Sequence, residues 1–114
     1  MNDNIVRDKF PAYLKSTGQA PDYYRVLDAE AYDFLIKKLS EKVTLLKNEK
    51  ANKNKIVPAL ILADVFEVSF ALAAKLGIPP EALGELAGEE RAEKGGYEEN
   101  WIMRNLPEMK RDEK

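Results

Sequence analysis

The longest apolar segment of the chain runs from Pro58 to Leu76 and sets the expected architecture. Its apolar residues follow a helical period, a proline stands at its start and Gly77 follows its end. Helix termini favour these two residues at these places. Nearly every face of the segment is apolar, which predicts a helix buried on all sides. We expect it to be too short and too often charged to span a membrane.

A second helix is expected over residues 29–48, with Asp28 as its N-cap. Its predicted apolar stripe consists of Tyr32, Leu35, Ile36, Leu39, Val43 and Leu46. Residues 48–55 contain no apolar side chain except Ala51, which predicts an exposed connection between two antiparallel helices.

Shorter patterns flank this pair. Phe10, Tyr13 and Leu14 share a helical face near the N-terminus. Residues 18–29 contain turn formers and then Tyr24–Leu27, a short segment that could lie extended on the helices. Another helix is expected at about 80–93, with Leu83 and Leu86 facing inward.

The segment Trp101–Met103 is apolar enough to be expected to pack back on the body. The pattern as a whole predicts an all-α protein, an antiparallel helical bundle with residues 1–106 as a single domain. Residues 107–114 are expected to form a charged, flexible tail.

The apolar helix at 58–76 has more apolar surface than one partner helix can cover in a chain of 114 residues. A symmetric homodimer, or a higher homo-oligomer, would bury the excess. Alternatively, the helix at 80–93 and the terminal segments cover it within one chain.

Composition excludes several chemistries. The chain has no cysteine and no histidine, which rules out disulfides, thiolate or imidazole zinc sites, and nucleophiles activated by histidine. Its net charge of -2 gives no global attraction to nucleic acid. No signal-peptide pattern opens the sequence, so a cytoplasmic location is expected. Catalysis, if present, must use carboxylates, lysines, arginines and a metal such as Mg²⁺ or Mn²⁺.

Asp64 and Glu67 interrupt the apolar helix one turn apart and therefore share a face. Two carboxylates on a buried stripe are costly unless a cation compensates them. Whether this chain is an enzyme therefore depends on which group faces Asp64.

Five segments, in order, carry a resemblance to a known family. They are IVRDKFP at residues 5–11, PDYYRVLDAEAY at 21–32, the KL-x-E motif at 38–41 within the expected helix at 29–48, LADVFEV at 62–68 and EERAEKGGY at 89–97. This set resembles the MazG-like all-α nucleoside triphosphate pyrophosphohydrolases, in particular the branch similar to phosphoribosyl-ATP pyrophosphohydrolase. The similarity extends from about residue 4 to residue 103.

The resemblance implies an oligomeric helical protein in which carboxylates hold Mg²⁺ and water cleaves a nucleotide between its α- and β-phosphates. It implies that the substrate pocket is bounded by the VRDK and RAEKGGY segments. The substrate-binding residues implied in this sequence are Arg7, Asp8, Lys9, Arg91 and Lys94.

The sequence departs from the family pattern at the metal site itself. The family places E-E-x-x-E on one helix and E-x-x-D on the next. Here only Glu41 and Asp64 remain of these acids, and the positions of three others hold Lys42, Leu45 and Ile61. Fewer carboxylates and an added ammonium group should weaken Mg²⁺ binding strongly.

Two interpretations of Lys42 stay open. Its ammonium group could pair with Asp64 and replace the metal, or it could extend to water while Asp64 makes a local hydrogen bond. If activity survives, the reduced site would use Glu41 and Asp64 as catalytic residues, with Glu41, Asp64 and Glu67 as ligands of Mg²⁺ or Mn²⁺.

Two other functions are compatible with the sequence. A non-catalytic relative would keep the fold and the basic residues and act as a nucleotide-binding or protein-interaction module, without a cofactor. Nucleic-acid binding would use a basic run, namely Lys37, Lys38, Lys42, Lys47, Lys50, Lys53 and Lys55. No aromatic residues interleave with these lysines, which favours a solvated face instead.

Overall fold

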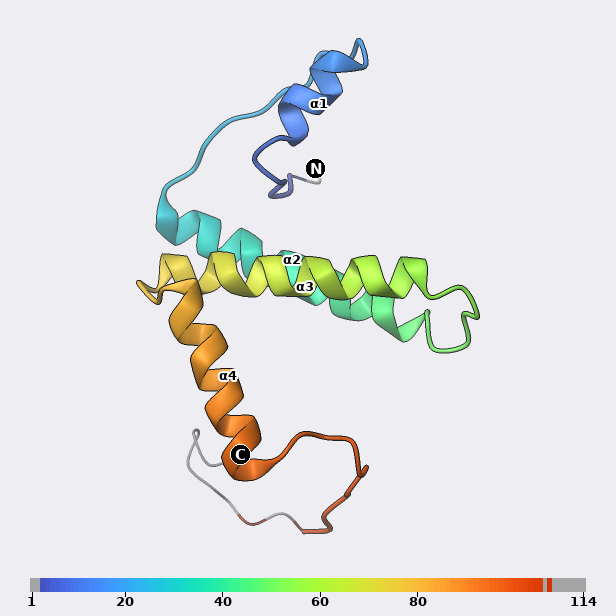
Figure 1. Cartoon of the computed structure of the whole chain (residues 1–114). Coiled ribbons are helices and arrows are strands. Elements are labelled where there is room, and N and C mark those ends of the chain that lie inside the picture. The colour runs from blue at the N-terminus through green and yellow to red at the C-terminus, as the bar shows by residue number, and fades with distance from the viewer. Residues whose placement is uncertain (1–2, 106, 108–114) are drawn as a thin grey trace.

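The computed structural model describes residues 3–105 and Pro107, and these residues form four helices without a strand. The helices are α1 (Phe10–Ser16), α2 (Asp28–Lys47), α3 (Ile56–Lys75) and α4 (Pro80–Lys94), in the order shown in Figure 1. The all-α class predicted from the sequence is therefore confirmed.

The centre of the molecule is an antiparallel hairpin of α2 and α3, joined by the exposed connection expected at residues 48–55 (Figure 1). The buried side chains come from these two helices. Ala31 and Leu35 come from α2, and Ile61, Val68 and Ala73 come from α3. Apolar residues spaced four apart on α2 lie on one face, which explains why this edge of the helix is buried.

Two helix starts differ from the prediction. Helix α3 begins at Ile56, so Pro58 is its third residue. Proline is tolerated there because the N–H groups of the first turn have no intrahelical partner. Helix α2 begins at Asp28 with Leu27 as its N-cap, so the prediction that Asp28 caps the helix is wrong. The Asp28 carboxylate instead pairs with the Lys75 ammonium at 3.0 Å, at the far end of α3.

The remaining elements project from the hairpin instead of covering it. Helix α4 packs only against α3, and α1 packs against none of the other helices. Residues 17–27 connect α1 to α2 as a separate strap and are not laid on the helices (Figure 1). The radius of gyration is 17.7 Å, whereas a compact chain of this length would have about 13 Å. The single chain is therefore open.

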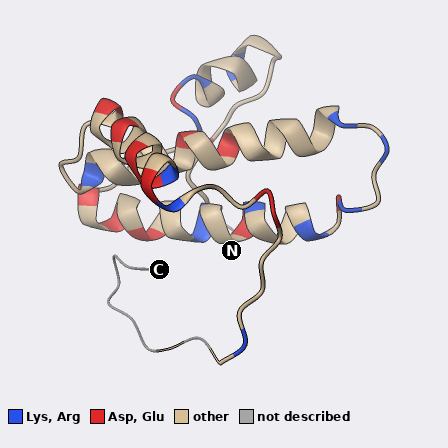
Figure 2. Ribbon diagram, turned by 60° about the horizontal axis from the view of Figure 1, so that its bottom comes forward, with Lys and Arg blue, Asp and Glu red and all other residues tan. Residues whose placement is uncertain are grey.

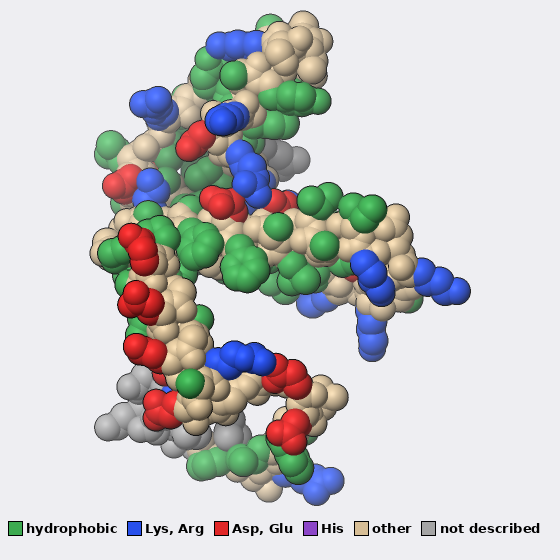
Figure 3. Space-filling model, viewed as in Figure 1, with side chains coloured by type: hydrophobic (Ala, Val, Ile, Leu, Met, Phe, Trp, Pro, Cys, Tyr) green, Lys and Arg blue, Asp and Glu red, His purple; other side chains and the backbone are tan. Residues whose placement is uncertain are grey.

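The expectation that the apolar helix is buried on all sides is wrong within one chain. Leu62, Phe66 and Phe70 are spaced four apart on the face of α3 opposite to Asp64. Phe66 is 67% exposed, and its ring stacks on Phe70 with centroids 6.3 Å apart. Figure 3 shows apolar side chains along the solvent side of α3, next to α4. Helix α4 is too peripheral to cover this stripe.

Several other apolar residues are more exposed than predicted. Ile36 and Val43 of α2 lie outside the buried stripe, and Leu86 of α4 does not face inward. Trp101 is 85% exposed, so the prediction that the segment Trp101–Met103 packs on the body is also wrong. Helix α4 points away from the hairpin, and the segment that follows it lies beyond the end of α4 that is far from the hairpin (Figure 1). Of the predicted tail at 107–114, all but Pro107 lies outside the described residues.

Within residues 3–105, α3 is the one helix long and apolar enough to cross a membrane by length and composition. The sequence argument that this segment is too short and too charged is wrong on those two criteria. The core helix of a soluble protein has the same length and composition but is mostly buried, whereas 17% of this segment is buried here. Asp64, at the middle of α3, forms ion pairs with two other parts of the chain.

The packing between α2 and α3 yields a stability prediction. Leu35 is 6% exposed, so Leu35→Ala should lower the free energy of unfolding by about 2–3 kcal/mol through lost apolar burial and a residual cavity. Leu27, which is 78% exposed, provides the control, because Leu27→Ala should change stability by less than about 0.5 kcal/mol. Urea denaturation of both variants measures the difference, and equal losses would contradict the proposed core.

Candidate functional site

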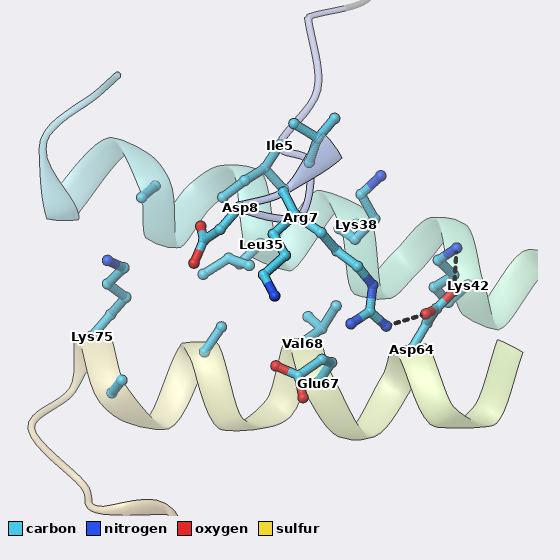
Figure 4. Close-up of a pocket in the computed structure, with 15 residues that line it drawn as sticks. Ile5, Arg7, Asp8, Leu35, Lys38, Lys42, Asp64, Glu67, Val68 and Lys75 are labelled. Carbon is cyan, nitrogen blue, oxygen red and sulfur yellow. Dashed lines mark hydrogen bonds and ion pairs between the residues drawn. The ribbon is translucent and has the colours of Figure 1, made fainter. Parts of the chain in front are cut away.

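The N-terminal segment 5–9 lies across the α2–α3 hairpin and encloses a cleft of about 620 Å³ with it. Apolar side chains from Ile5, Leu35 and Val68 form part of its wall (Figure 4). The charged residues of the wall are five cations, Arg7, Lys9, Lys38, Lys42 and Lys75, and three acids, Asp8, Asp64 and Glu67. The cleft therefore collects the VRDK segment and the acidic face of α3 in one place.

The Asp64 carboxylate binds two cations from different parts of the chain. Its Oδ1 accepts a hydrogen bond from Nη2 of Arg7 at 2.5 Å, and its Oδ2 lies 2.9 Å from Nζ of Lys42 (Figure 4). The Lys42 side chain is only 21% exposed, so it does not extend into bulk water. Of the two interpretations of Lys42, pairing with Asp64 is confirmed.

The fold explains how these three residues meet. Lys42 on α2 and Asp64 on α3 face each other across the antiparallel hairpin, so their contact follows from the register of the two helices. Arg7 belongs to the N-terminal segment that precedes α1. Hydrogen bonds to α2 hold this segment in place. There, Asn4 donates to the Glu41 carboxylate at 3.1 Å, and Lys37 donates to the backbone carbonyl of Asp3 at 3.4 Å.

These contacts change the acidity of Asp64. Hydrogen bonds from Arg7 and then from Lys42 lower its pKa below the ordinary value of 3.8, against a smaller opposing effect of burial. Both cations favour the ionised carboxylate. Asp64 is therefore a carboxylate whose charge is already compensated from within the chain.

The three proposed metal ligands are only partly brought together. Glu67 lines the same cleft as Asp64, one turn further along α3. Glu41 does not line the cleft, and its carboxylate accepts the hydrogen bond from Asn4 beside a second, shallower depression of α2. Among residues 3–105 and Pro107, no three acidic side chains are grouped so that they could hold a metal ion.

The proposed substrate-binding residues form two separate sets. Arg7, Asp8 and Lys9 all line the cleft. Arg91 and Lys94 lie on α4 and are not part of the cleft wall; Arg91 pairs with Glu98, and Lys94 lies 2.9 Å from Glu90. One chain therefore does not join the VRDK and RAEKGGY segments in a single pocket.

Two lysines of the cleft were not singled out as site residues from the sequence. Lys38 appears in the sequence analysis only as part of the basic run, and Lys75 stands at the end of α3. The structure also divides the basic run considered for nucleic acid. Lys38 and Lys42 line the cleft, whereas the basic residues of the connection between α2 and α3 lie at the far end of the hairpin (Figure 2). The sequence signal that could have grouped Lys38 with Lys42 is their spacing of four residues, which puts both side chains on one face of a helix.

No protein-family model, no curated protein and no solved structure matches this chain.

The ion pairs of Asp64 predict a pH-dependent contribution to stability. Because the folded-state pKa is lowered, the contribution is complete above pH 3.8 and is lost as the pH falls through the folded-state value. Asp64→Asn should therefore lower the free energy of unfolding by about 1 kcal/mol at neutral pH, a modest value because the pair is partly exposed. The deficit should disappear in acid.

Denaturant unfolding of the wild type and of Asp64→Asn across this pH range measures the effect. Glu67→Gln is the matched control, since Glu67 has no ion-pair partner within the described residues and should change stability by less than about 0.5 kcal/mol. A deficit in Asp64→Asn that does not depend on pH would contradict the ion-pair origin.

Proposed function

We propose that this chain is a MazG-like relative that binds a phosphorylated nucleotide in the cleft and does not hydrolyse it. The bond between the α- and β-phosphates would be cleaved by relatives that keep the full carboxylate set. In this chain the same cleft serves for binding, in the cytoplasm.

One observation supports the proposal above the others: Arg7 and Lys42 both contact the Asp64 carboxylate. A catalytic Mg²⁺ needs carboxylate oxygens that are free to coordinate it and to help orient water. Here Asp64 has two cationic partners, and the ammonium group of Lys42 lies 2.9 Å from its Oδ2 atom, across the helix hairpin. Coordination of a metal would require breaking these pairs.

The charge of the cleft suits a phosphate ligand. Five cations and three acids line the wall, a formal excess of two positive charges. Guanidinium and ammonium groups are the usual protein partners of phosphate oxygens. The apolar wall formed by Leu35 and Val68 adds a surface suited to the uncharged part of a nucleotide.

The catalytic alternative is Mg²⁺-dependent or Mn²⁺-dependent pyrophosphohydrolysis by a reduced site. It relies on Asp64 and Glu67, which share the cleft, and it needs at least one further oxygen ligand. Glu41 would have to leave Asn4 and turn toward the cleft to provide it.

A panel of nucleoside triphosphates together with phosphoribosyl-ATP separates the two functions. We expect at least one nucleotide to bind, measured by calorimetry, and no pyrophosphate release above background with Mg²⁺ or Mn²⁺. Release that is lost in both Glu41→Gln and Asp64→Asn would establish the catalytic alternative. Absence of binding by every nucleotide would contradict the proposal as a whole.

We also propose that the functional unit is a homodimer formed over the apolar stripe of exposed Leu62 and Phe66 and half-buried Phe70. An antiparallel pairing of α3 with its copy brings α4 of one protomer to the 48–55 connection of the other. The charges of these two elements are complementary, because exposed glutamates follow α4 and basic residues crowd the connection (Figure 2). The glutamates are Glu81, Glu85, Glu89, Glu90 and Glu93, and the lysines are Lys50, Lys53 and Lys55.

The dimer predicts that Phe66→Glu produces a folded monomer, because a carboxylate at the centre of an apolar interface cannot be compensated. Light scattering coupled to gel filtration measures the mass. Leu27→Glu is the control and should remain dimeric, since Leu27 is also largely exposed (78%, against 67% for Phe66) but lies outside the stripe. A monomeric wild-type protein at micromolar concentration would contradict the proposed dimer.

A further inference from the structure

We propose that the cleft binds the phosphate groups of its ligand without a divalent metal ion, with Lys42 in the place of the metal and Arg7 free to transfer from Asp64 to the phosphate. This inference rests on the proposed function and specifies the chemical form of the ligand: a metal-free polyphosphate.

The two cations at Asp64 are not equivalent. The Lys42 side chain is 21% exposed and lies between the helices of the hairpin, whereas the Arg7 side chain is 62% exposed and comes from the N-terminal segment. One carboxylate needs only one cation for neutrality. Lys42 can therefore remain on Asp64 while the guanidinium of Arg7 turns to an incoming anion.

The surroundings of Arg7 favour this exchange. Lys9 also lines the cleft and has no ion-pair partner within the described residues. Lys38 and Lys75 line the same wall, although each also has an acid nearby: Glu41 at 4.0 Å and Asp28 at 3.0 Å. Besides Asp64, the opposing charges that face the cleft are Asp8 and Glu67. A phosphate held between Arg7 and Lys9 would gain two charged partners for the one that Arg7 gives up.

Metal ions should therefore oppose binding. Mg²⁺ in solution binds polyphosphates and lowers their negative charge, which weakens their attraction to a positively charged cleft. In an enzyme that holds Mg²⁺ between carboxylates and phosphate, the same ion strengthens binding. The sign of the magnesium effect separates these two arrangements.

The test measures binding of inorganic pyrophosphate to the full chain by calorimetry, once with EDTA and once with excess Mg²⁺. We expect binding with EDTA and an affinity several-fold lower with Mg²⁺. Arg7→Gln should weaken binding with EDTA about tenfold, the effect of losing one strong charged contact. Lys47→Gln, a charge change of equal size outside the cleft wall, should leave the affinity unchanged.

Binding of pyrophosphate that requires Mg²⁺ would overturn the inference and leave the proposed nucleotide-binding function intact. An unchanged affinity in Arg7→Gln would also overturn it, because Arg7 would then not contact the phosphate. Absence of pyrophosphate binding under both conditions would overturn it as well, and the nucleotide panel would then decide separately whether the proposed function stands.

Discussion

The ion pairs of Asp64 join three parts of this chain at one carboxylate. Arg7 belongs to the N-terminal segment, Lys42 to α2 and Asp64 to the middle of α3. Because α1 packs against no other helix, the contact between Arg7 and Asp64 is a main tie between the N-terminal segment and α3. The cleft exists because this segment is held over the hairpin.

The same three residues explain why the site differs chemically from a metal centre. A carboxylate surrounded by other carboxylates attracts Mg²⁺, whereas a carboxylate with two cations offers the surroundings a net positive charge. Lys42 is a second cation beside Asp64, in addition to Arg7, so the immediate surroundings of this carboxylate are positively charged. Ile61, one turn before Asp64 on α3, is one of the buried residues of the hairpin and contributes to its core.

The sequence predicted the helices well because their periodicity and terminal residues are local properties. Proline at the start of α4 and Gly95 after its end are examples. The pairing of Lys42 with Asp64 was among the sequence hypotheses, because the resemblance aligns the two helices. The contact of Arg7 with Asp64 was not predicted, since it joins residues 57 positions apart with no helical register between them. The burial of Phe66 was predicted wrongly because apolar character does not say which chain covers it.

The most direct test is the pKa of the Asp64 carboxyl group, followed by ¹³C NMR in the wild type with and without Mg²⁺. An internally compensated carboxylate should titrate below 3.8, and Mg²⁺ should leave its resonance and its pKa unchanged. In Lys42→Met the pKa should rise toward the ordinary value. A titration at or above 3.8 in the wild type, or a shift of the Asp64 resonance on addition of Mg²⁺, would show that the carboxylate is available to a metal and would contradict the proposed site.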